Sequence, residues 1–164
     1  MKELKFITDG MLGKLTRWLR MLGQDVEYAS SPGDKELMAK AKKENRVLLT
    51  RDLELYQQAT ARGIDSFLVE SPNQTANLVN LAERFKFKLE IDLKASRCPK
   101  CNDKINEISK ASVAERIPLK TSANYDKFWR CEGCGQIYWR GAHWTRIDQT
   151  FEEARRTLAA KLHQ

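Results

Sequence analysis

Short apolar or alternating runs recur along the first 95 residues, with amphipathic segments between them. The runs have strand length and predict β-strands at residues 4–8, 25–29, 46–50 and 64–69. The segments place apolar side chains three and four positions apart, which predicts helices at residues 11–22, 31–45, 53–63 and around 78–85. Strands that alternate with helices form parallel sheets covered on both faces. The expected fold class is therefore α/β, a three-layer α/β/α domain with a mostly parallel sheet.

Capping residues mark two ends of these helices. Gly23 follows the first helix and predicts its C-terminal cap, because glycine readily adopts the left-handed backbone found there. Before the second helix, Ser31 is predicted as the N-cap and Pro32 as the first helical residue, with Asp34 three positions after the cap.

The alternating pattern stops near residues 86–97, and all four cysteines follow it. They form two CxxC pairs, Cys98 with Cys101 and Cys131 with Cys134. Two such pairs are typical of a structural zinc site with four thiolate ligands, in a small zinc ribbon. The residues just after the pairs, Asn102 and Gly135, tolerate the left-handed backbone that such turns often need. A disulfide or a redox CxxC is the alternative, although structural disulfides are rare in reducing compartments.

The long segment between the two cysteine pairs must fold as strands or a loop of its own. The end of the chain predicts one more helix at residues 151–163. This helix would present Phe151, Ala154, Leu158 and Leu162 on one face, behind a capping box of Thr150 and Glu153. We expect it to dock on the body of the protein, with an oligomer contact as the alternative. The expected division is an α/β domain at 1–95, a zinc ribbon at 96–147 and a C-terminal helix at 148–164.

Composition and charge narrow the class of protein. A hydrophobic content of 41% in 164 residues suffices for a packed core. No apolar run reaches membrane-spanning length and the first residues do not resemble a secretory signal, so we expect a soluble cytoplasmic protein that does not bind membranes. The net charge is +7, and residues 96–164 hold 13 basic and 8 acidic side chains against 16 and 14 in residues 1–95. This excess favours a polyanionic partner.

Three aspartates are the candidate catalytic residues. Asp9 and Asp52 follow the first and third predicted strands, and Asp34 begins the helix after the second. Ligands bind at the carboxyl ends of parallel strands, so these carboxylates are expected at one edge of the sheet. Two of them about 4 Å apart would repel by about 4 kcal/mol. A divalent Mg²⁺ or Mn²⁺ ion would relieve this repulsion and could activate water near a phosphate.

Each aspartate also has a structural explanation. Asp34 could serve only the dipole of its helix, and Asp9 and Asp52 could simply bond to nearby backbone amides.

Cationic and aromatic side chains are candidates for contacts with nucleic acid. Lys14, Arg17 and Arg20 are expected on the exposed arc of the first helix beside Asp9, although a solvated helix face would look the same. Trp18 lies on the apolar stripe of this helix and is expected in the core.

In the ribbon, Arg130, Arg140 and Arg146 alternate with aromatic residues, as in surfaces that bind single strands. These aromatic residues could equally form the core of the ribbon, and both roles stay open for Trp129, Tyr138, Trp139 and Trp144. His143 is expected to contact nucleic acid or to be structural rather than catalytic, because four cysteines already complete a zinc site and the aspartates can carry the chemistry.

Four stretches together resemble the Mut-seven C-terminal RNase family over about residues 4–147. They are FITDGMLGKLTRWLRMLGQDVEYA, the acidic D-x-E-L at 34–37, RVLLTRD at 46–52, and CPKC with FWRCEGCGQIYWRGAHW at 98–144. The resemblance implies a PIN-like nuclease domain followed by a zinc ribbon, with Asp9, Asp34 and Asp52 as metal-binding acids. A fourth acid, usual in PIN-like nucleases, has no clear position here.

The function expected on this basis is metal-dependent cleavage of RNA. Mg²⁺ or Mn²⁺ would serve catalysis, zinc would be structural, and the ribbon would help to hold RNA. Two alternatives remain: an adaptor that binds nucleic acid without cutting it, and a nuclease directed at DNA.

Overall fold

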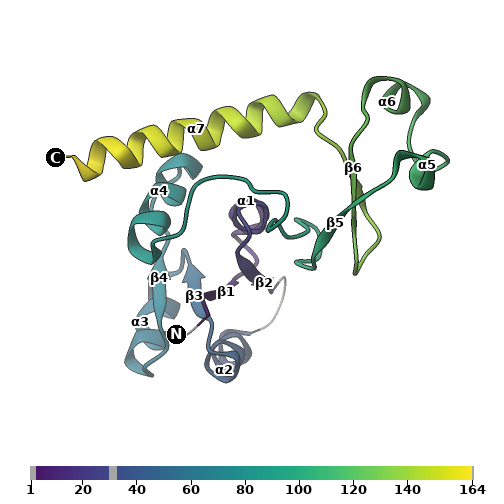
Figure 1. Ribbon diagram of the computed structural model, residues 1–164. Coiled ribbons are helices and arrows are strands. Elements are labelled where there is room, and N and C mark those ends of the chain that lie inside the picture. Colours follow the sequence, from purple (N-terminus) through teal and green to yellow (C-terminus); the bar gives the residue numbers. More distant parts are fainter. Residues whose placement is uncertain (1–2, 30–32, 164) are drawn as a thin grey trace.

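The structure is a computed structural model that describes residues 3–29 and 33–163. Its first part alternates strands and helices as the sequence predicts: β1 Lys5–Thr8, α1 Gly13–Met21, β2 Asp25–Tyr28, α2 Asp34–Glu44, β3 Val47–Thr50, α3 Leu53–Ala61, β4 Ser66–Leu68 and α4 Gln74–Phe85. The four strands form one parallel sheet in the order β2-β1-β3-β4 (Figure 1). The expected α/β class with a parallel sheet is confirmed.

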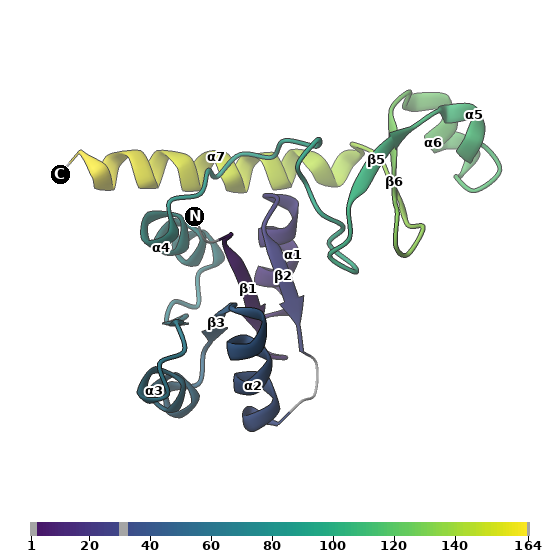
Figure 2. The same ribbon diagram turned by 60° about the horizontal axis from the view of Figure 1, so that its bottom comes forward.

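Neighbouring residues of the central strands bury their side chains on opposite faces of this sheet. Phe6 and Leu49 pack with the apolar residues of α1 and α4. Ile7 and Leu48 pack instead with the residues of α2 and α3. Figure 2 shows these two pairs of helices on opposite sides of the strands. The three-layer arrangement follows from the period-two geometry of strands whose two faces are both apolar.

The order of the strands creates one special position at the edge of the sheet. The chain leaves β1 for β2 on one side and later returns to pair β3 on the other side of β1. The helix after β1 and the helix after β3 cover opposite faces of the sheet. The carboxyl ends of β1 and β3 therefore flank a topological switch point, where open α/β sheets bind their ligands.

The start of α2 differs from the prediction. Ser31 and Pro32 lie outside the described residues, and Gly33 is the N-cap of the described helix. Asp34 is thus the first helical residue and not the third. The predicted glycine cap of α1 is confirmed, because Gly23 has a φ of +88° and its amide donates to the carbonyl oxygen of Arg20.

A second, antiparallel sheet follows in the cysteine-containing part of the chain. It consists of β5 Ile105–Ile108, β6 Phe128–Cys131 and β7 Ile137–Tyr138 in that order. We call residues 97–141, which contain this sheet, the ribbon module. Two short helices that the sequence reasoning did not predict, α5 Lys110–Val113 and α6 Leu119–Asn124, lie between β5 and β6.

The last helix, α7 Ala142–Leu162, starts nine residues earlier than the position predicted from residue 151. The predicted capping box is therefore wrong. Thr150 lies inside the helix, where its hydroxyl donates to the carbonyl oxygen of Arg146 at 3.0 Å. Such a back-bond satisfies a threonine within a helix and leaves no capping role.

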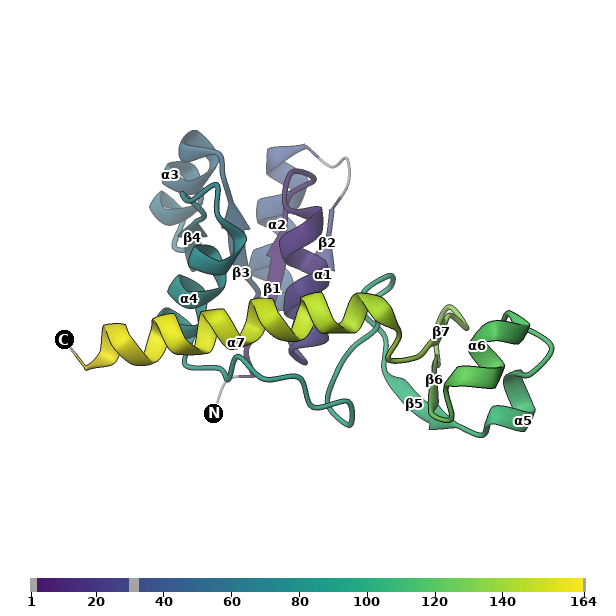
Figure 3. The same ribbon diagram turned by 90° about the horizontal axis from the view of Figure 1, so that it is seen from above.

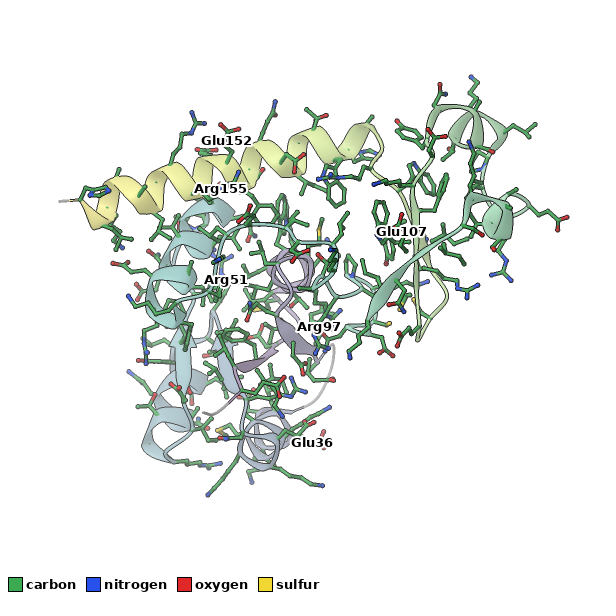
Figure 4. All side chains as sticks on the ribbon, in the orientation of Figure 1. Glu36, Arg51, Arg97, Glu107, Glu152 and Arg155 are labelled. Atoms are coloured by element: carbon green, nitrogen blue, oxygen red, sulfur yellow. The ribbon has the colours of Figure 1, made fainter. Side chains whose placement is uncertain are left out.

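Helix α7 docks on the part of the chain that contains the parallel sheet, as expected. We call this part, residues 3–29 and 33–96, the sheet region. Phe151 is buried and packs edge-on against Trp18, with ring centroids 5.0 Å apart. Ala154 is also fully buried, and Arg155 donates to the carbonyl oxygen of Leu89 (Figure 4). Figure 3 shows the helix lying across α4 and α1. The prediction that Trp18 belongs to the core is confirmed.

Polar contacts join the first cysteine turn to the edge of the parallel sheet. Arg20 is 6% exposed, and it donates to the carbonyl oxygens of Val26 and Pro99, each at 2.9 Å. Asn102 accepts a hydrogen bond from the amide of Val26 at 3.0 Å and donates to Asp25 at 2.8 Å. Figure 4 places Arg97 at the same junction. The expectation that Arg20 is exposed was wrong, because the turn that covers it comes 79 positions later in the chain.

Candidate metal sites and nucleic-acid interface

Asp9 and Asp52 lie at the switch point and are linked through one threonine. Asp9 follows β1, and its Oδ2 accepts a hydrogen bond from the hydroxyl of Thr50 at 2.6 Å. The same hydroxyl oxygen accepts from the amide of Asp52 at 3.0 Å. Thr50 is fully buried at the end of β3, so a fixed side chain relates the two acidic positions.

Backbone amides orient the same two carboxylates. Asp9 accepts from the amide of Met11 at 2.9 Å. Asp52 is the N-cap of α3 and accepts from the amides of Glu54 at 2.9 Å and Leu55 at 3.3 Å. These bonds are the ones that a purely structural explanation expects, and they also hold each carboxylate in a single orientation. Asp52 accepts both bonds through Oδ1, and its Oδ2 makes no hydrogen bond within the described part of the chain.

Asp34 is not brought into contact with the other two aspartates. It is exposed in the first turn of α2. Among the described residues, the four cysteines are the only group of three or more potential metal ligands that lie close enough together to share one ion. The structure thus pairs Asp9 and Asp52, and the assignment of all three aspartates to one catalytic metal stays a prediction.

Sequence reasoning missed Thr50 as a residue of this site. The signal was a polar residue that ends the apolar run RVLLT directly before an acidic cap.

The four cysteines form a compact cluster. Their sulfur atoms all lie within 4.8 Å of one another, with 3.3 Å between Cys101 and Cys131 and 3.7 Å between Cys98 and Cys134. Sulfur ligands at the usual Zn–S distance of about 2.3 Å stand roughly 3.8 Å apart in a tetrahedron. All four cysteines are free of disulfide bonds. The donor set and its spacing therefore fit a tetrahedral zinc ion.

Backbone geometry around the cysteine turns supports thiolate chemistry. Asn102 and Gly135 have φ values of +75° and +76°, which confirms the left-handed backbone predicted after each pair. Burial alone would raise the pKa of Cys131, but amide donors from Cys134 and Gly133 and a bond with Cys101 lower its pKa to about 7. Because metals bind the thiolate form, these donors favour metal binding at Cys131, whereas burial raises the pKa of Cys98 and Cys101.

A model of one protein family, the Mut7-C RNAse domain, matches residues 4–151. This match covers both candidate sites and nearly the whole chain. The chain belongs to the Mut7-C RNAse domain family. Searches of curated proteins and of solved structures returned no match. The family resemblance expected from the quoted motifs is confirmed, and it supports a nuclease-like function for this chain.

Two of the three cations expected on α1 of this Mut7-C domain are exposed, Lys14 and Arg17. Arg20 instead serves the junction with the ribbon module through its two backbone acceptors. The RNA-binding role of all three residues stays a prediction, and for Arg20 the burial of the side chain argues against it.

In the ribbon module and the first turn of α7, the cations predicted to contact RNA are at the surface. Arg130 lies exposed on β6, and His143 lies exposed in the first turn of α7. Arg140 is also exposed, and its guanidinium lies over the ring of Trp144 at 4.8 Å. Their contact with RNA stays a prediction.

The ribbon aromatics serve mainly its packing. Trp129 is buried beside Cys98 and Cys131, and Trp139 packs against Phe128. Together with apolar residues of the linker, four aromatics line a small cavity of about 40 Å³ between the ribbon module and the start of α7: Trp129, Tyr138, Trp139 and Trp144.

No helix in the described ranges has the length and apolar character needed to span a membrane.

Proposed function

We propose that this protein is a metal-dependent ribonuclease with a PIN-like nuclease domain and a structural zinc ribbon. The observation that carries the proposal is the pairing of Asp9 and Asp52 through Thr50 at the switch point of the sheet, in a chain of the Mut7-C RNAse domain family. Carboxylate oxygens are the ligands that Mg²⁺ and Mn²⁺ prefer. Asp9 and Asp52 would hold the ion, and Asp34 would complete its ligands from the first turn of α2.

The side chains of the site have separate tasks in this proposal. Thr50 and the amides after Asp9 and Asp52 orient the carboxylates before the substrate arrives. A bound Mg²⁺ or Mn²⁺ ion would supply an activated water and neutralise charge on the scissile phosphate. Lys14 and Arg17 attract and orient the RNA backbone next to this acidic edge.

The cysteine cluster supports a structural role for zinc. Four thiolates fill a tetrahedral ion and leave no open position for substrate. Zinc would hold the two turns of the ribbon module together. Arg130 and Arg140 would contact RNA from the surface of this module, and His143 would do so from the first turn of α7.

One observation favours a second candidate function, an adaptor that binds nucleic acid and does not cut it. The carboxylate of Asp34 does not group with those of Asp9 and Asp52 in the described structure. A binding protein would need only the cationic surface, and the carboxylates would then be helix caps and turn acceptors.

The deciding experiment incubates the zinc-loaded full chain with labelled single-stranded RNA, duplex RNA and DNA. Each substrate is tested with Mg²⁺, with Mn²⁺ and with neither. We expect RNA cleavage that requires the added ion. Cleavage by an Asp9→Asn variant purified in the same way reveals any contaminating nuclease. RNA binding without ion-dependent cleavage would reject the ribonuclease and leave the adaptor.

A further inference from the structure

A groove of about 370 Å³ lies between α1 and the two cysteine turns. Along α1 it is lined by residues of a single helical face, among them Gly13 and Arg17. The far wall comes from the ribbon module and includes Lys100, Gln136 and Tyr138, while Tyr28 closes the end of β2. The groove thus runs from the turns of the cysteine cluster to Gly13 at the start of α1 and Tyr28 at the end of β2.

Tyr28 is fixed at the end of the groove nearest to Asp9. Its hydroxyl donates to the carbonyl oxygen of Gly10 at 2.9 Å, and its side chain is 39% exposed. A Cβ atom at Gly13 would lie only 3.2 Å from that hydroxyl, so glycine at position 13 lets the ring lie against the loop. The result is an aromatic ring with little rotational freedom, anchored one residue from a candidate catalytic carboxylate.

The charged side chains that line the groove are all positive. Arg17 and Lys100 are exposed on opposite walls, and neither makes an ion pair in the described part of the chain. Arg20 adds a third positive charge to the wall while it bonds to backbone carbonyls. No carboxylate is among the described residues that line the groove. Cations on two walls beside an exposed aromatic ring match the chemistry of a nucleotide strand.

We propose that this groove binds a single strand of RNA, with an unpaired base stacked on Tyr28 and phosphates held by Arg17 and Lys100. This assignment rests on the proposed ribonuclease function, because it places the strand next to Asp9. A base can stack on the face of Tyr28 only when it is not already paired and stacked within a duplex. The groove therefore favours single strands over duplexes. The ribbon module then forms one wall of the substrate path, and Tyr28 and Lys100 join the residues that position RNA.

The test measures the affinity of zinc-loaded full-length variants for a labelled oligouridylate of about 12 nucleotides. Fluorescence anisotropy is recorded at several salt concentrations, without Mg²⁺ or Mn²⁺, so that binding is separated from cleavage. Tyr28→Leu should weaken binding about five- to tenfold, whereas Tyr28→Phe keeps the ring and should bind within about twofold of wild type. Lys100→Ala should weaken binding and lower the salt dependence by about one phosphate contact. Lys43→Ala removes the same charge from α2, which covers the opposite face of the sheet from α1 and does not line the groove, and should change nothing.

Each outcome bears on the groove directly. Equal affinity of Tyr28→Leu, Lys100→Ala and wild type would overturn the proposal, and so would tighter binding of duplex RNA than of the single strand. Equal binding of single-stranded DNA supports it, since stacking and phosphate contacts do not require the 2′-hydroxyl. A wild-type chain that binds RNA through these residues but does not cleave it with Mn²⁺ leaves the groove in place and rejects only the ribonuclease.

Discussion

The cysteine cluster and the acidic pair are built in different ways. The cysteines come as two pairs of near neighbours in the sequence, whereas the two aspartates come from the ends of separate strands. Each cysteine pair lies in one tight turn, and two turns meet to give four sulfur atoms within 4.8 Å. Asp9 and Asp52 come from the ends of β1 and β3, and Thr50 links them only because these strands are neighbours in the sheet. The four cysteines are a closed, complete set of tetrahedral ligands, although Cys101 and Cys134 are exposed, whereas the half-buried Asp9 and the exposed Asp52 are an open set with too few ligands to complete a metal site. A closed set suits a structural ion, and an open one suits a reacting phosphate.

The largest effect is expected when one thiolate ligand of the cysteine cluster is removed. Cys131→Ser should abolish zinc binding and unfold the ribbon module, because a structural zinc ion supplies roughly 10 kcal/mol of folding free energy in small modules. The sheet region should stay folded, since its apolar clusters are separate from those of the ribbon module. Zinc content and limited proteolysis measure this, with Lys127→Ala as an exposed control in the same module. Metal-free protein whose residues 97–141 still resist protease would contradict the structural role.

A smaller loss of stability is expected at the junction between the first cysteine turn and the edge of the parallel sheet, where Asp25 lies. Burial disfavours the charge of Asp25, but hydrogen bonds from Arg46 and Asn102 and the nearby guanidinium groups hold its pKa below the ordinary value. A lowered pKa gives stability that is present above the unfolded-state pKa of about 4 and is lost as the pH falls through the folded-state pKa.

Asp25→Asn should therefore lower the free energy of unfolding by about 2 kcal/mol at pH 7. The difference from wild type should shrink as the pH falls below the unfolded-state pKa of about 4 and through the lower folded-state pKa. Denaturant unfolding at pH 7 and at a series of acidic pH values measures this difference. Asp65→Asn, which removes an exposed carboxylate 3.8 Å from Arg84, is the control and should have little effect. Equal stability of Asp25→Asn and wild type at pH 7 would mean that the junction does not depend on this charge.

The smallest change in stability, with a clear change in activity, is expected at Thr50. Thr50→Val keeps the shape of the side chain but removes the hydroxyl that bonds to Asp9 and Asp52, so stability should fall by about 1 kcal/mol. Cleavage should fall about tenfold or more, because a group that orients a metal ligand is lost. Thr50→Ser should restore much of the activity. Thr60→Val, which removes an exposed hydroxyl in α3, is the matched control. Unchanged cleavage by Thr50→Val would mean that this threonine does not help to orient the catalytic carboxylates.

The sequence predicted the features that depend mainly on residues close together in the chain. The strands and helices of the sheet region follow from side-chain spacing, and the left-handed turns at Asn102 and Gly135 follow from residue type. The start of α7 could not be placed this way. Its first turns carry few buried side chains, and Thr150 offered a false cap.

The features that the sequence did not reveal depend on distant partners. Arg20 lies off the apolar stripe of α1, so its spacing indicated exposure, yet the carbonyl of Pro99 covers it. Thr50 and Tyr28 gained their roles only when the sheet brought β1, β2 and β3 side by side. Asp9 and Asp52 were predictable because the ends of parallel strands share one edge of the sheet. For Asp34, no such rule fixes how far the first turn of α2 lies from them.

The most direct test of the catalytic claim pairs activity with stability for Asp52→Asn. Asparagine keeps an oxygen acceptor and is as good an N-cap as aspartate, so α3 should keep its cap and the melting temperature should stay within a few degrees of wild type. Loss of the charged ligand should nevertheless lower Mn²⁺-dependent RNA cleavage more than about a hundredfold. RNA binding should persist, because the cations remain. An Asp52→Asn protein that melts like wild type and cleaves RNA at the wild-type rate would contradict the acidic metal site.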